Sequence, residues 1–100
     1  MDKFPVTEGH TLIIPKRHVA KYFELYQPEL NAAQSLLSQI KREIARADGK
    51  VSGFNMGVNE GVSAGQTISH CHVHLIPRRG GDVENPRGGV RGVIPAKQNY

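Results

Sequence analysis

Cysteine, aromatic residues and long apolar runs are scarce in this sequence, and each shortage excludes a class of protein. The single cysteine, Cys71, rules out a disulfide within the chain, which is typical of a reducing compartment. Aromatic residues make up only 6% and no single basic stripe stands out, so no nucleic acid polymer is expected as a partner. No apolar run approaches the roughly 18 residues of a membrane span, and residues 1–5 lack the apolar core of a signal peptide. We therefore expect a cytoplasmic protein with no membrane contact.

The length and charge of the chain set the next limits. One hundred residues, of which 38% are hydrophobic and 22% charged, predict a single globular domain over residues 1–100. A chain this short buries a smaller share of its surface than a long one, and association into a dimer is a natural remedy. The net charge of +4 favours anionic partners such as phosphates.

One long helix is predicted over residues 28–47. Leu30, Ala33, Leu37 and Ile40 recur at intervals of three and four residues, which marks one buried stripe. Pro28 suits the first turn of this helix, where its missing N–H would be unpaired in any residue. A shorter helical turn is expected within residues 19–26.

Three strands are predicted around this helix, at residues 11–14, 52–59 and 67–77. In the second strand Phe54, Met56 and Val58 alternate with small or polar residues, as expected of a half-buried strand. A tight connection is expected between the last two strands, which favours an antiparallel pair with the helix over its dry face. Residues 80–92 are predicted to be loop, with a short edge strand at residues 93–94. The fold class is therefore α+β, an antiparallel sheet with one main helix packed on it.

The third strand carries the residues with the most chemistry. His70, His72 and His74 alternate with apolar residues, so in a strand the three imidazoles share one face and Cys71 and Val73 lie on the other. A helix would scatter the same residues around its circumference. The pattern indicates a strand with a dry back on the core and an imidazole-lined front.

Three interpretations of this histidine cluster compete. Histidines two apart on a strand can bind one metal ion, but zinc wants three or four ligands and often a thiolate or carboxylate, whereas Cys71 points away and the strand holds no acidic residue. A structural role would crowd three rings that titrate near pH 6.5. Catalysis uses imidazole as a nucleophile and proton shuttle near neutral pH. We favour catalysis and expect no metal ligands.

The loop before the histidines favours phosphate chemistry. Residues 59–67 contain two glycines, Gly61 and Gly65, which let backbone N–H groups approach a phosphate, and Asn59, Gln66 and Thr67 can donate hydrogen bonds. Such donors would stabilise the charge on a phosphoryl group in transfer. By itself the loop is more simply interpreted as a plain hairpin connection, and the phosphate interpretation gains its strength from the three histidines beside it.

These segments together resemble the histidine-triad (HIT) superfamily of nucleotide hydrolases and transferases. The signature of that family is three histidines, each followed by an apolar residue, with one more apolar residue at the end, and residues 70–76 fit it at every position. The similarity extends to residues 9–15, 64–67 and 77–78 and covers residues 2–82 with hardly a gap.

The resemblance implies a role for each of four histidines. His72 would be the nucleophile that takes AMP as a covalent adduct. His74 would contact the α-phosphate and help to protonate the leaving group. His70 and His10 would form a supporting pair that orients the nucleophile.

The resemblance also implies a set of nucleotide-binding residues. Asn59 would contact the phosphate or the leaving group, Asp2 the ribose hydroxyls, and Ile13 would line a purine slot. The expected contacts of the α-phosphate are Gly65, Gln66, Thr67 and His74. Arg78 and Arg79 could help to bind a polyphosphate, although solvated arginines are the default.

The resemblance implies a nucleotidyl hydrolase or transferase that cleaves AMP from a dinucleoside polyphosphate or a similar AMP conjugate. Pro77 in place of glycine favours the dinucleoside-polyphosphate branch over the phosphoramidase branch. No cofactor is expected on the protein, although Mg²⁺ could accompany a polyphosphate substrate, and relatives commonly form homodimers. Members of the family usually carry a strand before the position of Asp2, so we expect either a shortened form or a fold that manages without that strand. A nucleotide-binding adaptor or sensor with little turnover is the alternative.

Overall fold

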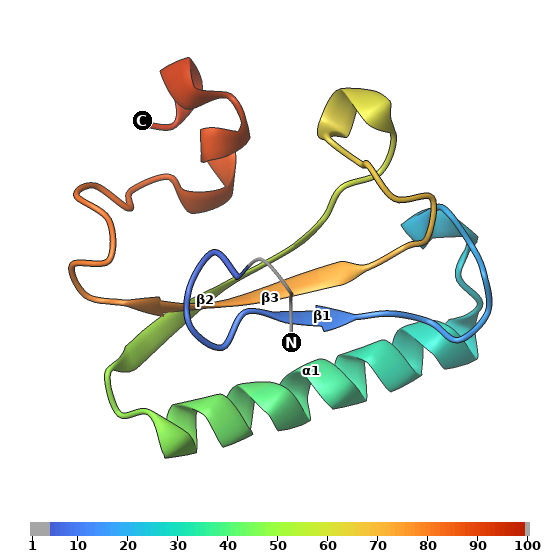
Figure 1. The fold of residues 1–100 in the computed structure, drawn as a ribbon, viewed down its shortest axis with the longest axis horizontal. Helices are drawn as coiled ribbons and strands as arrows, with labels where there is room; N and C mark the ends of the chain where they lie inside the picture. The colour runs from blue at the N-terminus through green and yellow to red at the C-terminus, as the bar shows by residue number, and fades with distance from the viewer. Residues whose placement is uncertain (1–4, 100) are drawn as a thin grey trace.

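A computed structural model of the protein describes residues 5–99. Three strands and one long helix form its framework, with four short 3₁₀ turns between and after them (Figure 1). The bounds of the framework elements are β1 Thr11–Ile13, α1 Gln27–Ala47, β2 Val51–Val58 and β3 Val73–Arg79. The 3₁₀ turns are η1 Tyr22–Glu24, η2 Val62–Ala64, η3 Gly89–Val93 and η4 Pro95–Lys97.

The strands form one antiparallel sheet in the order β1-β3-β2, with β3 in the centre. Helix α1 contacts all three strands from one side of the sheet, and the C-terminal segment with η3 and η4 lies on the other side (Figure 1). The predicted α+β class, with one main helix on an antiparallel sheet, is confirmed.

The predicted helix is confirmed within one residue at its start. Pro28 occupies the first turn, and the Glu29 carboxylate accepts a 2.8 Å hydrogen bond from the Tyr26 N–H, which caps the helix start. The apolar stripe faces β2, where Leu30 and Leu37 line a small cavity of about 220 Å³ together with Met56 and other residues. The helix therefore covers the sheet without burying any of its residues completely.

The core lies on the back of β3, as the alternation predicted. Cys71 and Leu75 are 1% exposed, and Val73 and Pro77 are also buried. The intervening residues are only half-buried, because they lie on the opposite face.

That opposite face is called the histidine face here. Residues paired across neighbouring strands share a face, and the register pairs His74 with Leu12 of β1 and with Gly57 of β2. The histidine face therefore consists of Leu12, Gly53, Asn55, Gly57, His74, Ile76 and Arg78.

One predicted strand is wrong in part and another is absent. Strand β3 begins at Val73 and not at residue 67, because the Cys71 N–H donates to the Val19 carbonyl (2.7 Å) and not to a neighbouring strand. The connection from β2 is correspondingly long, over residues 59–72, and is not a tight turn. The predicted edge strand at residues 93–94 is also absent: Val93 ends η3, and the Ile94 N–H donates back to the Arg91 carbonyl.

In the part of the chain that the structure describes, α1 is too polar to cross a lipid bilayer, and no other helix is long enough.

Candidate active site

The ring of His72 is oriented by the backbone of the residue two positions before it. Its Nδ1 lies 2.9 Å from the His70 carbonyl oxygen, which can only accept, so Nδ1 carries a hydrogen. In the neutral ring the lone pair is then on Nε2, an assignment that follows from the hydrogen-bond partner. The His74 ring centroid is 5.0 Å away, with the two rings edge to face. His72 therefore presents a nucleophilic nitrogen beside His74.

A chain of two hydrogen bonds holds His74 in the opposite tautomer to His72. The Val6 N–H donates to Nδ1 of His10 (3.0 Å), so the hydrogen of the neutral His10 ring is on Nε2. That nitrogen lies 2.9 Å from Nδ1 of His74, which must accept. In the neutral His74 ring the hydrogen is consequently on Nε2, an atom with less than 1 Å² exposed. His74 thus holds a hydrogen-bond donor out of contact with bulk water.

The expected pairing of His10 with His70 is therefore wrong, because His10 is bonded to His74. The antiparallel register explains this, since Leu12 pairs with His74 and places the neighbouring β1 residues beside it. His10 is 1% exposed, which makes it the buried polar residue of the described chain and a support for the site.

The ring of His70 turns toward a different partner. Its Nε2–H donates to the Pro15 carbonyl (2.9 Å), and its ring lies 5.0 Å from that of His18. Since the His70 carbonyl holds His72, His70 orients that ring through its backbone, while its own ring anchors the loop to the end of β1. The sequence drew no attention to the Pro15 carbonyl, and no local pattern reveals a partner 55 residues away.

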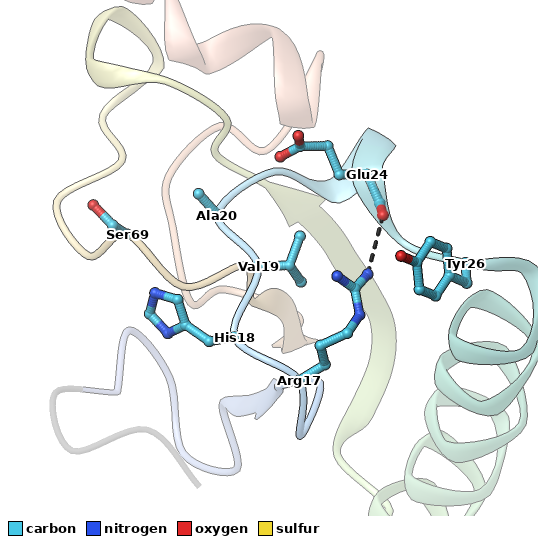
Figure 2. A pocket seen from close by; sticks show the side chains of 7 residues that line it. All are labelled: Arg17, His18, Val19, Ala20, Glu24, Tyr26 and Ser69. Carbon is cyan, nitrogen blue, oxygen red and sulfur yellow. Dashed lines mark hydrogen bonds between the residues drawn. The ribbon is translucent and has the colours of Figure 1, made fainter.

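A pocket of about 560 Å³ lies beside His70, on the segment that follows β1 (Figure 2). Figure 2 shows His18 and Ser69 along one side, while Arg17 turns toward Glu24 and Tyr26. The residues that line it are Arg17, His18, Val19, Ala20, Glu24, Tyr26 and Ser69. None of the predicted catalytic histidines is among them, so the pocket lies next to the candidate active site and is not part of it.

Gln66 is committed to holding the loop in place. Its Oε1 accepts the Gly61 N–H (2.8 Å), and its Nε2 donates to the carbonyls of Ala20 (2.8 Å) and Ile68 (3.1 Å). The side chain therefore ties the loop to itself and to the segment after β1. A direct contact of this amide with phosphate stays a prediction, and would require one of these bonds to break.

The predicted nucleotide contacts of Gly65, Thr67 and Asn59 stay predictions. Gly61 and Gly65 have φ of +91° and +93°, which only glycine adopts without strain, so these glycines shape the loop that carries Thr67. Asn59 follows β2 directly on the histidine side of the connection and is half-buried. Asp2 lies outside the described residues.

The prediction that Ile13 lines a purine slot is wrong. Ile13 pairs with Val73 on the back of the sheet and is 7% exposed, so it belongs to the core. Its neighbour Leu12 pairs with His74 and lies on the histidine face. The period-two alternation of β1, applied from His10, could have identified Leu12.

Cys71 lies on the core side of β3, away from the histidine face, and burial raises the pKa of its thiol. Among residues 5–99 no three His, Cys, Asp or Glu side chains gather closely enough to hold a metal ion.

Comparison with known proteins agrees with this geometry. A family model described as HIT domain matches residues 1–81. The chain belongs to the HIT family. It is 42% identical over 78 residues to an uncharacterized HIT-like protein of Mycoplasma genitalium, covering 78% of this chain and 55% of that one.

Two HIT relatives carry the names of enzymes. An asymmetrical bis(5′-nucleosyl)-tetraphosphatase of Schizosaccharomyces pombe is 37% identical over 78 residues, covering 78% of this chain and 42% of its own. An adenylylsulfatase of Arabidopsis thaliana is 42% identical over 79 residues, covering 79% of this chain and 40% of its own. The chain thus spans about half the length of the curated relatives that it matches.

The HIT fold is also found in solved structures. A hypothetical histidine triad nucleotide-binding protein of Sulfolobus tokodaii matches with a TM-score of 0.75 and 41% identity, covering 82% of this chain and 54% of that one.

Proposed function

We propose that this HIT protein is a nucleotidyl hydrolase or transferase that cleaves AMP from a dinucleoside polyphosphate or a similar AMP conjugate. The observation that carries the proposal is that two adjacent rings are in opposite tautomers. His72 has a lone pair on Nε2, whereas His74 has a hydrogen on Nε2. A nucleophile and a hydrogen-bond donor side by side are what an in-line displacement at phosphorus needs.

The first step forms a bond between Nε2 of His72 and the α-phosphorus. The bond from phosphorus to the leaving-group oxygen breaks, and its electron pair departs with that oxygen. The adducted ring keeps its Nδ1 hydrogen, so it becomes positively charged, and the His70 carbonyl that accepts this hydrogen stabilises the charge. The Nε2–H of His74 is covered in the free protein; substrate binding would uncover it, and it would then donate a hydrogen bond to the oxygens that gain negative charge.

The second step releases AMP. Water attacks the α-phosphorus, the phosphorus–nitrogen bond breaks, and the electron pair returns to Nε2 of His72. The proton lost by the water passes to solvent. The two-step path replaces one difficult displacement with two easier ones, and transfer to an acceptor other than water would make the same site a transferase.

The proposed binding residues surround this chemistry. Asn59, Gly65 and Thr67 would hold the α-phosphate from the loop, and Leu12 replaces Ile13 as the apolar residue beside the nucleoside. The relatives named as a tetraphosphatase and an adenylylsulfatase support a nucleotide substrate with a bond at the α-phosphate. A homodimer and a cytoplasmic location remain parts of the proposal.

Release of AMP from diadenosine tetraphosphate tests the proposal. We expect the wild type to release AMP and His72→Ala to lose at least about 10³-fold in rate, since removal of a nucleophile leaves only the binding contribution. His18→Asn, which removes an exposed imidazole outside the proposed machinery, serves as the matched control and should stay within about threefold.

A second readout is the intermediate itself. Rapid acid-free quenching followed by intact mass measurement should show a covalent AMP adduct on the wild type and none on His72→Ala. Equal release of AMP from both proteins would remove His72 from the role of nucleophile. Tight nucleotide binding without release would instead identify an adaptor or sensor.

A further inference from the structure

Two adjacent arginines at the end of β3 lie on opposite faces of the sheet. Arg78 continues the series of His74 and Ile76 and pairs with Gly53, so it lies on the histidine face. Arg79 lies on the other face, where its guanidinium bonds the Asp48 carboxylate at 3.0 Å and the Glu8 carbonyl at 2.9 Å. Only Arg78 therefore shares a surface with the proposed nucleophile.

Arg78 is held in one position by two partners. Its Nε and Nη2 donate to the two oxygens of Asp82 (2.8 and 2.9 Å), and its Nη1 donates to Oδ1 of Asn55 (2.7 Å). These bonds use three of the five N–H donors of a guanidinium. A side chain that is 22% exposed and already oriented loses little conformational entropy when it binds a further acceptor.

One guanidinium nitrogen, Nη1, bonds a residue that lies nearer to the histidines than Gly53, the pairing partner of Arg78. Asn55, which receives Nη1, pairs with Ile76 and not with Arg78, so the bonded nitrogen lies about two residues from His74 along the strand. At ~3.4 Å per residue this corresponds to roughly 7 Å. A leaving group attached to an α-phosphate at His72 and His74 can span that interval.

The strip of β2 beside this interval has no side chains that would block it, apart from Asn55. Gly57 pairs with His74 and Gly53 with Arg78, and a Cβ on either glycine would meet no atom within 4 Å. The C-terminal segment borders the strip, since a Cβ on Gly89 would lie 3.4 Å from the amide nitrogen of Asn55. Open backbone therefore lies beside His74 and beside Arg78, and Asn55 is the one β2 side chain between them on this face.

We propose that Arg78, positioned by Asp82 and Asn55, binds the leaving group and selects substrates in which AMP is joined to an anionic oxyacid, a phosphate chain or a sulfate, over those in which AMP is joined to an amine. This inference rests on the proposed function and names the substrate class of that site. A guanidinium is suited to such oxygens because its planar array of donors matches two of them at once.

The orientation of His74 favours the same substrate class. A phosphate or sulfate departs as a stable anion and needs only hydrogen bonds, whereas an amine must take a proton as it leaves. The hydrogen-bond chain from Val6 through His10 gives His74 a neutral ring with one hydrogen, which suits hydrogen-bond donation better than full proton transfer.

Paired double variants test the inference. Removing Arg78 alone would leave the Asp82 carboxylate facing the substrate, so the test variant is Arg78→Gln with Asp82→Asn. The matched control, Arg79→Gln with Asp48→Asn, removes the equivalent ion pair from the opposite face. The substrates are diadenosine tetraphosphate, adenylyl sulfate and adenosine 5′-phosphoramidate, and the readout is the ratio of kcat/KM on each anhydride to that on the phosphoramidate.

We expect this ratio to fall at least about tenfold in the test variant, as befits loss of a charged hydrogen bond, and to stay within about threefold in the control. A fall with the tetraphosphate alone assigns Arg78 to a phosphate chain, and a fall with both anhydrides assigns it to any anionic oxyacid. Unchanged ratios, or equal losses in both double variants, would overturn the inference.

Binding separates failure of this inference from failure of the proposed function. In a His72→Ala background, calorimetry should show the Kd for diadenosine tetraphosphate rising about tenfold when Arg78 and Asp82 are replaced, with the Kd for AMP unchanged. Circular dichroism checks that both double variants are folded. Loss of affinity for AMP and tetraphosphate alike would show that Arg78 is structural, whatever the activity of the wild type.

Discussion

At the scale of single residues, the direction of each hydrogen bond decides the chemistry of the ring that makes it. His72 and His74 are both bonded through Nδ1, but one donates to a carbonyl and the other accepts from His10. Identical side chains two residues apart therefore carry their hydrogens on different atoms. The buried His10, through Val6, is the residue that imposes this difference.

Replacement of His10 tests this arrangement. His10→Phe keeps the ring volume but removes both nitrogens, so the bonds to Val6 and His74 are lost in a buried site. We expect the free energy of unfolding to fall by about 1–3 kcal/mol, measured by urea denaturation, together with slower AMP release.

His18→Phe is the matched control for this experiment, because its ring is exposed. It should change the free energy of unfolding by no more than about 0.5 kcal/mol. If His10→Phe were as stable and as active as this control, the hydrogen-bond chain would have no role in the site.

At the scale of elements, α1 and β3 are joined at one end by a pair of charges. The Asp48 carboxylate, which follows α1, accepts from the Lys50 N–H (2.9 Å) and from Arg79 of β3 (3.0 Å). The Lys50 N–H, and next to it the Arg79 guanidinium, hold the pKa of this carboxyl below its usual range. The helix, which has no completely buried residue, is thus also attached to the sheet by an ion pair.

The pKa of Asp48 predicts a pH-dependent stability. A carboxyl whose pKa is lower in the folded than in the unfolded protein stabilises the fold fully above the unfolded value of about 4, and this contribution is lost as the pH falls through the folded value. We expect Asp48→Asn to lower Tm by a few degrees at most at pH 7, and the difference from wild type to shrink steadily below about pH 4. Thermal unfolding followed by circular dichroism measures this.

Glu84→Gln removes an exposed carboxylate elsewhere and controls for the change in net charge. A difference between Asp48→Asn and wild type that persisted unchanged in acid would mean that the charge on Asp48 contributes nothing.

The elements also show where local patterns predict structure well. The stripe of Leu30 and Leu37 predicted α1, and the alternation of Phe54 with Met56 predicted β2, because both depend on the fixed geometry of a helix or strand. The same reasoning placed residues 67–72 in a strand, although the Cys71 N–H bonds the Val19 carbonyl across the chain. Alternation predicts which face a residue takes, but not which backbone group pairs with its N–H.

At the scale of the whole molecule, the C-terminal segment is a folded unit beyond the matched HIT domain. Gln98 donates from its amide to the carbonyls of Asn85 (3.3 Å) and Arg87 (3.2 Å), which closes the segment on itself. Gly88, with φ of +91°, lets Gln98 approach so closely that a Cβ would lie 1.9 Å from the Gln98 carbonyl oxygen. Contacts between η3 and β2 then place this unit beside the histidine face.

Substitution of Gly88 tests whether the closed segment depends on this approach. Gly88→Ala should open residues 83–99, because the added Cβ would overlap the Gln98 carbonyl and strain a positive φ. We expect faster proteolytic cleavage in this segment while the sheet and α1 keep their protection, measured by limited proteolysis and hydrogen exchange.

Gly80→Ala is the control, since a Cβ there would meet nothing within 4 Å. Equal protection of residues 83–99 in the two variants would show that the segment is held by other contacts.

The sequence by itself determined what depends on neighbours along the chain: the long helix, the two faces of the central strand, and the histidine motif that identifies the family. The tertiary structure alone decided which atoms meet across the fold. His10 and His74 are 64 residues apart, and their bond, which sets the hydrogen of the second ring, follows from the register of β1 on β3. The same register sends Ile13 to the core and Leu12 to the histidine face, and alternation along β3 separates Arg78 from Arg79. The physical reason is that side-chain periodicity is a local property of the backbone, whereas the partner of a hydrogen bond is chosen by packing between distant segments.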